Sequence, residues 1–484
     1  MPPTVLTSYA VPPQPPEPAG GSADLPAVRV RSARDLVAAV PHLLGYRPHE
    51  SLVVVCVTDE SVLGLVARVG LDDLAREVVE PPAGRERAVD RLVAAARRVG
   101  TTEIVAVVHT ARDPRRIRRT VDPALAALEL AGDVEPWIVT PEGYRGIDCS
   151  DPSCCPPRGR PLAELEHRAV NAALVLAGRA VAPSAEEAYR IVPASEARRS
   201  RAARAAARAD RARAAVDAAA GALGGRSSGA AGSPPSSPSP MPARTPSSMP
   251  SSTRTDAARR ASSGYDLWCD LVRHAARELR TAPPGGTDLP PARLGRLAVA
   301  LAEVPVRDAV LLSTIPGADE VARRTARGAA DLPGEAHART PGDAGPGDAG
   351  PGDAGPGDEA FDVEAATARA IARIVDPRVA VRPDPGAVAA ARVVLEQVVA
   401  HVPRRWHAAP LTLLGLLAWW QGDGGLAAHR LAAARAVDPA YRLAALFGGV
   451  LSAAVPPGWV RTREVARGAD GGGRGLDAAD PSVG

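Results

Sequence analysis

The chain has 484 residues, enough for about three domains, but its 49 prolines and 45 glycines show that much of it cannot pack into a core. All of its 58 basic residues are arginine, and they nearly balance 55 acidic residues, so the net charge of +3 excludes the general electrostatic signature of a nucleic-acid-binding protein. Aromatic residues make up only 3% of the chain, which predicts cores of small aliphatic side chains, mainly on helices.

The Pro-rich residues 1–26 are predicted to be a disordered tail. They are not expected to be a signal peptide, because they lack its basic start and its apolar run. The longest apolar stretches, such as residues 411–420, are about half as long as a membrane span requires. We therefore expect a cytoplasmic protein without membrane contact. Its five cysteines are then expected to be reduced, metal-bound or catalytic.

Residues 27–195 are predicted to form an α/β domain with a mixed sheet and helices packed against it. Ser32 is a candidate N-cap of a helix that ends near Gly45. The β-branched run 52–57 predicts a buried central strand, which forms a hairpin with residues 62–71. Further along, the pattern predicts helices at residues 86–99, 114–130 and 162–177, and strands at residues 103–109 and 134–139.

Three cysteines follow the last predicted strand within a short Pro-flanked segment, Cys149, Cys154 and Cys155. Three thiolates supply most of a tetrahedral shell for zinc, which makes these residues the candidate metal ligands. No second chelating pair exists, so His167, Cys56, Cys269 or His109 would have to be the fourth ligand. A redox pair of Cys149 with a neighbour, or a tight turn whose thiols only pack, are the two alternatives.

His109 and Asp113 stand where the third predicted strand ends, at the sheet edge where open α/β sheets bind ligands. The sequence contains no glycine-rich phosphate loop, no Gly-x-Ser-x-Gly elbow and no His-Glu-x-x-His. The common signatures of hydrolases, kinases and nucleotide-binding enzymes are therefore absent.

Residues 196–222 are predicted to form an Ala/Arg-rich helix. Its arginines recur at three- and four-residue steps and so form one stripe: Arg198, Arg201, Arg204, Arg208 and Arg211. The stripe fits either a contact with phosphates or acidic surfaces, or a solvated helix face, and we favour the solvated face.

Two segments are predicted to be disordered linkers: the Ser/Pro-rich residues 223–262, and residues 333–359, which repeat Pro-Gly-Asp-Ala-Gly. Between them, residues 263–332 are predicted to be helical, with helices at 265–279 and 291–315. Residues 360–460 are predicted to form an all-α domain with helices at 388–401, 410–420, 425–437 and 439–451. Residues 461–484 are predicted to be a disordered tail.

Within the C-terminal domain, Trp419-Trp420 and the Asp438-Pro439 pair resemble a tetratricopeptide-like helical hairpin. Only one such unit is visible, and we expect both tryptophans to be core anchors rather than a binding groove. Helical hairpins of this kind contact proteins, so a protein partner of these C-terminal helices is expected.

Several blocks together resemble the domain-of-unknown-function family numbered 4192. They are Pro41-His-Leu-Leu-Gly45-Tyr-Arg-Pro48 with Ser51, the cysteine cluster, Val306-Arg-Asp308-Ala, and the segment from Trp419 to Tyr441. The resemblance spans most of residues 28–460 outside the linkers. It supports the domain layout and implies no activity, substrate or catalytic residue.

These patterns predict a non-catalytic binding or regulatory protein, because no catalytic constellation is visible. The alternative is a metal- or thiol-dependent enzyme centred on Cys149, Cys154 and Cys155.

Overall fold

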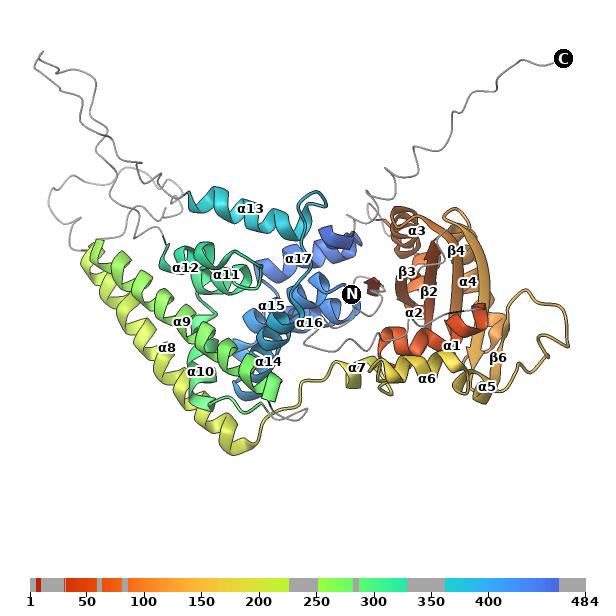
Figure 1. Cartoon of the computed structure of the whole chain (residues 1–484), viewed down its shortest axis with the longest axis horizontal. Helices are drawn as coiled ribbons and strands as arrows, with labels where there is room; N and C mark the ends of the chain where they lie inside the picture. The colour runs from red at the N-terminus through yellow and green to blue at the C-terminus, as the bar shows by residue number, and fades with distance from the viewer. Residues whose placement is uncertain are drawn as a thin grey trace, which may run out of the picture. The chain divides into compact units, whose positions relative to one another are not determined.

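The structure is a computed structural model of the chain and describes residues 6–9, 30, 32–58, 63–80, 86–225, 251–281, 287–328 and 362–460. These residues belong to two compact units. Unit 1 comprises Met1–Val192, Ile374–Arg382 and Leu411–Gly484, and unit 2 comprises Pro193–Arg373 and Pro383–Pro410. The colours of Figure 1 follow the chain through its elements, and each unit combines segments that are far apart in sequence.

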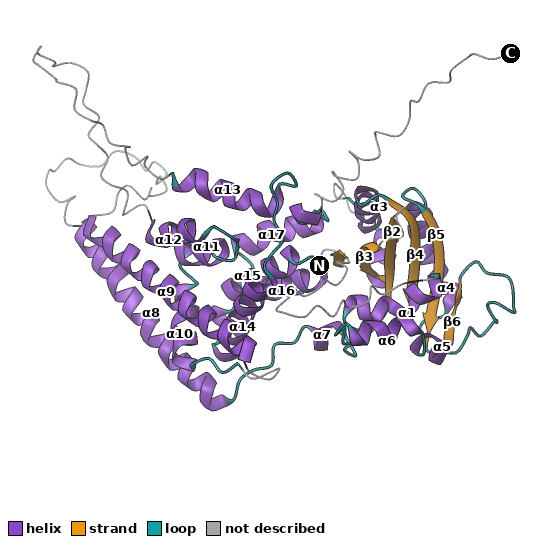
Figure 2. Ribbon diagram, viewed as in Figure 1, coloured by secondary structure: helices purple, strands orange, loops and turns teal. Residues whose placement is uncertain are grey.

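Unit 1 contains a mixed sheet of six strands in the order β1-β3-β2-β4-β5-β6 (Figure 2). Only β4 and β5 run parallel, and the other neighbouring strands are antiparallel. The strands are β1 (Leu6–Tyr9), β2 (Ser51–Thr58), β3 (Leu63–Gly70), β4 (Thr101–His109), β5 (Asp133–Thr140) and β6 (Gly143–Gly146). The predicted β2–β3 hairpin is confirmed, whereas β1 lies inside the segment predicted to be a disordered tail.

Both faces of this sheet are buried, which explains the unbroken β-branched run of β2. Leu52 and Val54 belong to a core formed with α2 (Leu71–Val79), α3 (Ala88–Arg98) and α4 (Pro114–Leu128). Val53 and Val55 point to the opposite core, which includes residues of α1 (Ala33–Leu44), α5 (Leu162–Glu166) and α6 (Ala169–Leu176). Successive side chains of β2 thus point alternately into two cores, one on each face of the sheet.

The predicted start of α1 is confirmed, because the Ser32 hydroxyl accepts a hydrogen bond from the Asp35 backbone N–H at 3.3 Å. Gly45 ends this helix in the left-handed region with φ of 78°. The prediction of one helix over residues 162–177 was wrong. Arg168 adopts an extended conformation between α5 and α6, and its guanidinium pairs with Asp35 on α1.

The C-terminal part of unit 1 contains α15 (Ala408–Trp420), which begins at the end of unit 2, α16 (Gly424–Val437) and α17 (Arg442–Ser452). Trp419 and Trp420 are buried, and their indole N–H groups donate to the carbonyl oxygens of Val455 and Val381. Both side chains are therefore core anchors, as the sequence predicted. The short α7 (Ala185–Ala188) also belongs to this unit.

In the described residues of unit 2, helices are the only regular secondary structure. Its helices are α8 (Glu196–Gly225), α9 (Ser251–Thr281), α10 (Pro291–Ala300), α11 (Val304–Leu312), α12 (Asp319–Arg327), α13 (Val363–Val375, at the boundary with unit 1), α14 (Pro385–His401) and a 3-10 turn at Arg404–Trp406. The helix α9 begins inside the segment predicted to be a linker. The prediction of one helix over residues 291–315 was wrong, because Pro305 cannot donate to the carbonyl of Leu301 and Glu303 is extended.

Close backbone contact joins α8 to α10 in unit 2. A side chain at Gly295 would collide with the carbonyl oxygen of Ala202, so only glycine allows this approach. Ala202, Ala205 and Ala206 form the buried face of α8. Among the described residues, no helix is both long and apolar enough to cross a membrane.

Candidate functional site

The predicted cysteine cluster lies in the loop that follows β6. This loop is held at both ends, because the backbones of Tyr144 and Arg160 exchange hydrogen bonds of 2.9 and 2.8 Å. Inside the loop, the Asp151 carboxylate accepts hydrogen bonds from the backbone and the hydroxyl of Ser153 at 2.8 and 2.7 Å. The resulting turn returns the chain, and the Asp151 carbonyl accepts from the Cys155 N–H at 2.8 Å.

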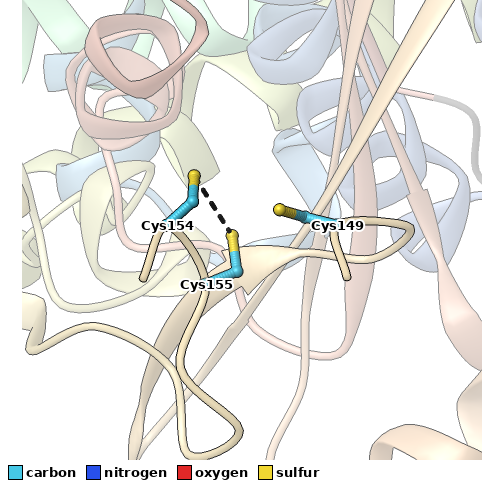
Figure 3. A group of neighbouring side chains, drawn as sticks. All are labelled: Cys149, Cys154 and Cys155. Atoms are coloured by element: carbon cyan, nitrogen blue, oxygen red, sulfur yellow. Dashed lines mark hydrogen bonds between the residues drawn. The ribbon is translucent and has the colours of Figure 1, made fainter. Parts of the chain in front are cut away.

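This turn brings the three predicted cysteines together. The sulfur atoms of Cys149, Cys154 and Cys155 lie within 4.8 Å of one another, and those of Cys154 and Cys155 are 3.9 Å apart. In Figure 3 the three thiols converge on a common space. Cys149 is exposed, Cys154 is half-buried and Cys155 is buried, so one side of the cluster is open to solvent.

Hydrogen-bond donors surround the sulfur atoms. The Arg34 guanidinium lies 3.0 Å from the Cys154 sulfur, and the Gly146 N–H donates to the Cys155 sulfur at 3.3 Å. A backbone hydrogen bond at Asp151 and the neighbouring thiols lower the pKa of Cys149, whereas burial raises the pKa of Cys155. The exposed Cys149 is thus converted to a thiolate more readily than the buried Cys155.

None of the four residues expected to complete a metal shell joins this cluster. Cys56 is fully buried in β2, where burial raises its thiol pKa to about 12, and Cys269 lies on α9 in unit 2. The Nδ1 atom of His167 is within 2.7 Å of the Ala163 carbonyl, and His109 ends β4. Within the described ranges, no fourth histidine, cysteine or acidic ligand atom belongs to the group of three thiols.

A second candidate site is a pocket of about 1080 Å³ in unit 1, which does not include the cysteines. It lies where the parallel strands β4 and β5 end, between that sheet edge and the helices α1, α5 and α6. This is the edge at which open α/β sheets bind ligands. Most of its lining is apolar, and its polar lining residues are His42, Arg47, His49, His109, Thr110, Thr140, Glu166, His167, Arg168 and Asn171.

His109 is the lining residue with the most unusual environment. Its side chain is only 9% exposed, and its buried Nε2 atom has no hydrogen-bond partner. Burial, together with the positive charge of Arg68, lowers its pKa to about 3, so the ring is neutral at physiological pH. Ser51 faces His109 across the sheet, and its hydroxyl is also buried without a partner, so the two residues do not satisfy each other.

Asn171 on α6 is a further lining residue that no sequence pattern indicated. Its amide nitrogen donates to the Leu165 carbonyl at 2.9 Å, which supports the end of α5. Its buried Oδ1 atom has no partner. Only the break between α5 and α6 makes this position part of a pocket, so no signal in the sequence could have identified it.

Glu50 was also missed, although it lies in the block Arg47-Pro-His-Glu-Ser51. Its carboxylate accepts hydrogen bonds from the Thr110 hydroxyl at 3.0 Å and the Ala111 N–H at 2.8 Å, and pairs with Arg112 at 2.9 Å. It has a positive φ of 41°, which is uncommon outside glycine. Glu50 therefore fixes the loop after β4 that carries one wall of the pocket.

The other residues that the sequence suggested have structural contacts. Asp113 caps α4 by accepting from the Arg115 N–H at 2.9 Å. In the predicted arginine stripe, Arg198 pairs with Asp288 and donates to the Leu289 carbonyl. Arg201, Arg204, Arg208 and Arg211 are exposed on α8, opposite its buried alanines. Four of the five arginines of the predicted stripe are thus exposed, which favours a solvated face, whereas Arg198 is half-buried in contacts within unit 2.

Comparison with known proteins agrees with the resemblance seen in the sequence. No curated protein matches the chain, and no solved structure does. A family model matches residues 34–340 and 322–458, which include most of both compact units. The chain therefore belongs to the family described as Domain of unknown function (DUF4192).

Proposed function

We propose that unit 1 binds a small, uncharged organic molecule in the pocket at the ends of β4 and β5, and that the protein is a non-catalytic binding or regulatory protein. The observation that carries this proposal is His109, a lining residue of the pocket whose buried Nε2 atom has no hydrogen-bond partner. Such an atom costs about 1–3 kcal/mol when it stays unsatisfied. A ligand that hydrogen-bonds to it would recover this free energy.

The chemical class of the ligand is inferred from the lining. Ionic groups are neutralised locally, because Arg47 pairs with Glu166 at 3.4 Å and Arg168 pairs with Asp35. The remaining surface is largely apolar, as in most small-molecule sites. Asn171 also lines the pocket, and its buried Oδ1 atom is an acceptor without a partner. A mostly apolar molecule that donates one hydrogen bond to Asn171 and forms another with His109 fits these groups.

The test is a thermal-shift screen of the full chain against uncharged metabolites, followed by calorimetry of each hit. Ala172 lines the pocket and the adjacent Ala173 does not, so Ala172→Trp and Ala173→Trp form a matched pair on α6. We expect the first variant to abolish binding and the second to retain it. Equal affinity in the two variants, or no hit that depends on His109, would refute the proposal.

The predicted protein partner of the C-terminal helices stays a prediction, as does the cytoplasmic location. We further propose that α15 and α16 form the predicted tetratricopeptide-like hairpin. Support comes from Gly415, where an added side chain would meet Leu431 Cγ at 3.0 Å and the Ala427 carbonyl at 3.2 Å, so a small residue allows the close approach. Truncation of residues 385–460, followed by affinity purification with the native cytosol, tests the partner, and unchanged partner recovery would remove the helical hairpin from the proposal.

A further inference from the structure

We propose that Cys149, Cys154 and Cys155 bind a zinc ion as three thiolate ligands, with one coordination position left for an exchangeable ligand. This site is separate from the His109 pocket and does not depend on the function proposed for it. The proposal develops the alternative stated for the sequence, a metal- or thiol-dependent enzyme centred on this cluster, into a specific set of ligands.

The spacing of the sulfur atoms suits zinc. A Zn–S bond length of about 2.3 Å in a tetrahedral shell places neighbouring sulfur atoms about 3.8 Å apart. The Cys154 and Cys155 sulfurs are 3.9 Å apart, and all three sulfurs lie within 4.8 Å of one another. Cys149 is exposed, so its side chain can rotate toward the other two sulfurs.

The loop is already folded into the conformation that binding requires. Its two ends are joined by the Tyr144–Arg160 backbone pair, and Asp151 fixes the turn between them. Gly146 permits Cys149 to approach β6, because an added Cβ would lie 3.2 Å from the Cys149 Cβ. Binding would therefore require little ordering of the loop, and its entropic cost would be small.

The charges around the cluster favour a divalent ion. Three thiolates and Zn²⁺ carry a net charge of −1, which the Arg34 guanidinium, 3.0 Å from the Cys154 sulfur, would neutralise. A monovalent ion such as Cu⁺ would leave a larger uncompensated charge. Arg34 also lies over the Trp137 ring, 5.9 Å from its centroid, which holds the guanidinium in place. Arg34 and the Gly146 N–H thus act as outer-shell donors to the sulfurs.

Binding converts each thiol that is protonated into a thiolate and releases its proton to the buffer, while the Zn²⁺ charge is unchanged. Affinity should therefore fall as the pH is lowered. The described part of the chain provides no fourth protein ligand in this group, so water or a small anion would complete the shell. Three protein ligands and one open position are the arrangement found in catalytic rather than structural zinc sites.

The test uses the full-length chain, reduced and handled without oxygen. Zinc is titrated against a chromophoric chelator, and Co²⁺ is used as a coloured substitute whose thiolate charge-transfer absorption reports sulfur ligands. We expect about one equivalent of zinc, and at least a tenfold loss of affinity in Cys149→Ser, Cys154→Ser and Cys155→Ser. The matched control Cys269→Ser, which alters a half-buried thiol on α9, should bind zinc normally.

If Cys155→Ser fails to fold because this residue is buried, Cys149→Ser still tests the proposal, because Cys149 is exposed. Arg34→Gln should weaken zinc about tenfold while the cobalt absorption keeps its thiolate character, as expected for an outer-shell residue. Less than a tenth of an equivalent of zinc in the reduced protein, or unchanged affinity in Cys149→Ser, would overturn the proposal. A disulfide that persists in the presence of excess reductant would also overturn it.

Discussion

Replacing His109 with leucine should make the ligand-free protein more stable. Leucine has a similar size and no polar atom, so the substitution removes the unpartnered Nε2 from a side chain that is only 9% exposed. Leaving a buried polar atom without a hydrogen bond costs about 1–3 kcal/mol of stability. We therefore expect the free energy of unfolding to rise by about 1–2 kcal/mol at pH 7.5 when this atom is removed. For a unit of this size that corresponds to a Tm increase of about 2–8 °C.

The advantage of the variant should grow as the pH falls. The folded-state pKa of His109 is about 3 and lies below the value of 6.5 typical of an unfolded chain, so the unfolded state binds the proton first. The wild type is therefore fully stable above pH 6.5 and loses free energy between pH 6.5 and pH 3, by up to about 1.4 kcal/mol per pH unit. The His109→Leu variant has no titrating ring at this position, so it does not lose this free energy as the pH falls.

The measurement is hydrogen exchange of β4 peptides, combined with urea unfolding, at pH 7.5 and pH 5.5. His49→Leu is the matched control, because His49 lines the same pocket and its side chain is exposed. We expect the difference between His109→Leu and the wild type to increase by about 1 kcal/mol at the lower pH. A variant that is less stable than the wild type at pH 7.5, or whose advantage does not change with pH, would show that Nε2 has a partner in solution.

Three further predictions concern the pocket loop, the helix contact in unit 2 and the arginine stripe. Glu50→Ala should lower the free energy of unfolding by about 1–3 kcal/mol and speed hydrogen exchange at residues 110–113. Glu50→Gln should have a smaller effect. Unchanged exchange would contradict the role of this carboxylate. Gly295→Ala should destabilise unit 2 by about 1–3 kcal/mol in urea unfolding. The control Gly449→Ala, whose added Cβ would meet no neighbouring atom, should not destabilise the protein. If the two variants were equally stable, α8 and α10 would be farther apart in solution. Replacing the exposed Arg204 and Arg208 with alanine should change stability by less than about 0.5 kcal/mol per residue, and a larger loss would reveal a contact of the stripe.

Local features of the α/β part could be predicted from the sequence. The cap at Ser32, the buried run of β2 and the hairpin to β3 depend on residues close together in the chain, so short-range patterns were sufficient. The break between α5 and α6 could not be predicted, because it depends on Arg168 reaching Asp35, more than a hundred residues earlier.

The candidate sites, too, could be predicted from the sequence only in part. The spacing of Cys149, Cys154 and Cys155 identified a cluster, and the turn at Asp151 brings it together. Arg34 and Gly146, which donate to the sulfurs, come from α1 and β6 and gave no signal in the sequence. His109 was placed correctly at the end of a strand, but its burial and its unpartnered nitrogen follow from the surrounding fold.

The division of each unit among distant segments has a consequence for synthesis on the ribosome. The sheet of unit 1 is complete in sequence by Gly146, yet this unit also takes in residues from Leu411 onward. A nascent chain that has reached Arg373 has all strands but lacks α16 and α17, so apolar surface that these helices cover in the finished protein stays exposed to chaperones and proteases. We expect fragments that end before α16 to aggregate. Co-expression of residues 1–250 with residues 251–484 should restore a folded, noncovalent complex.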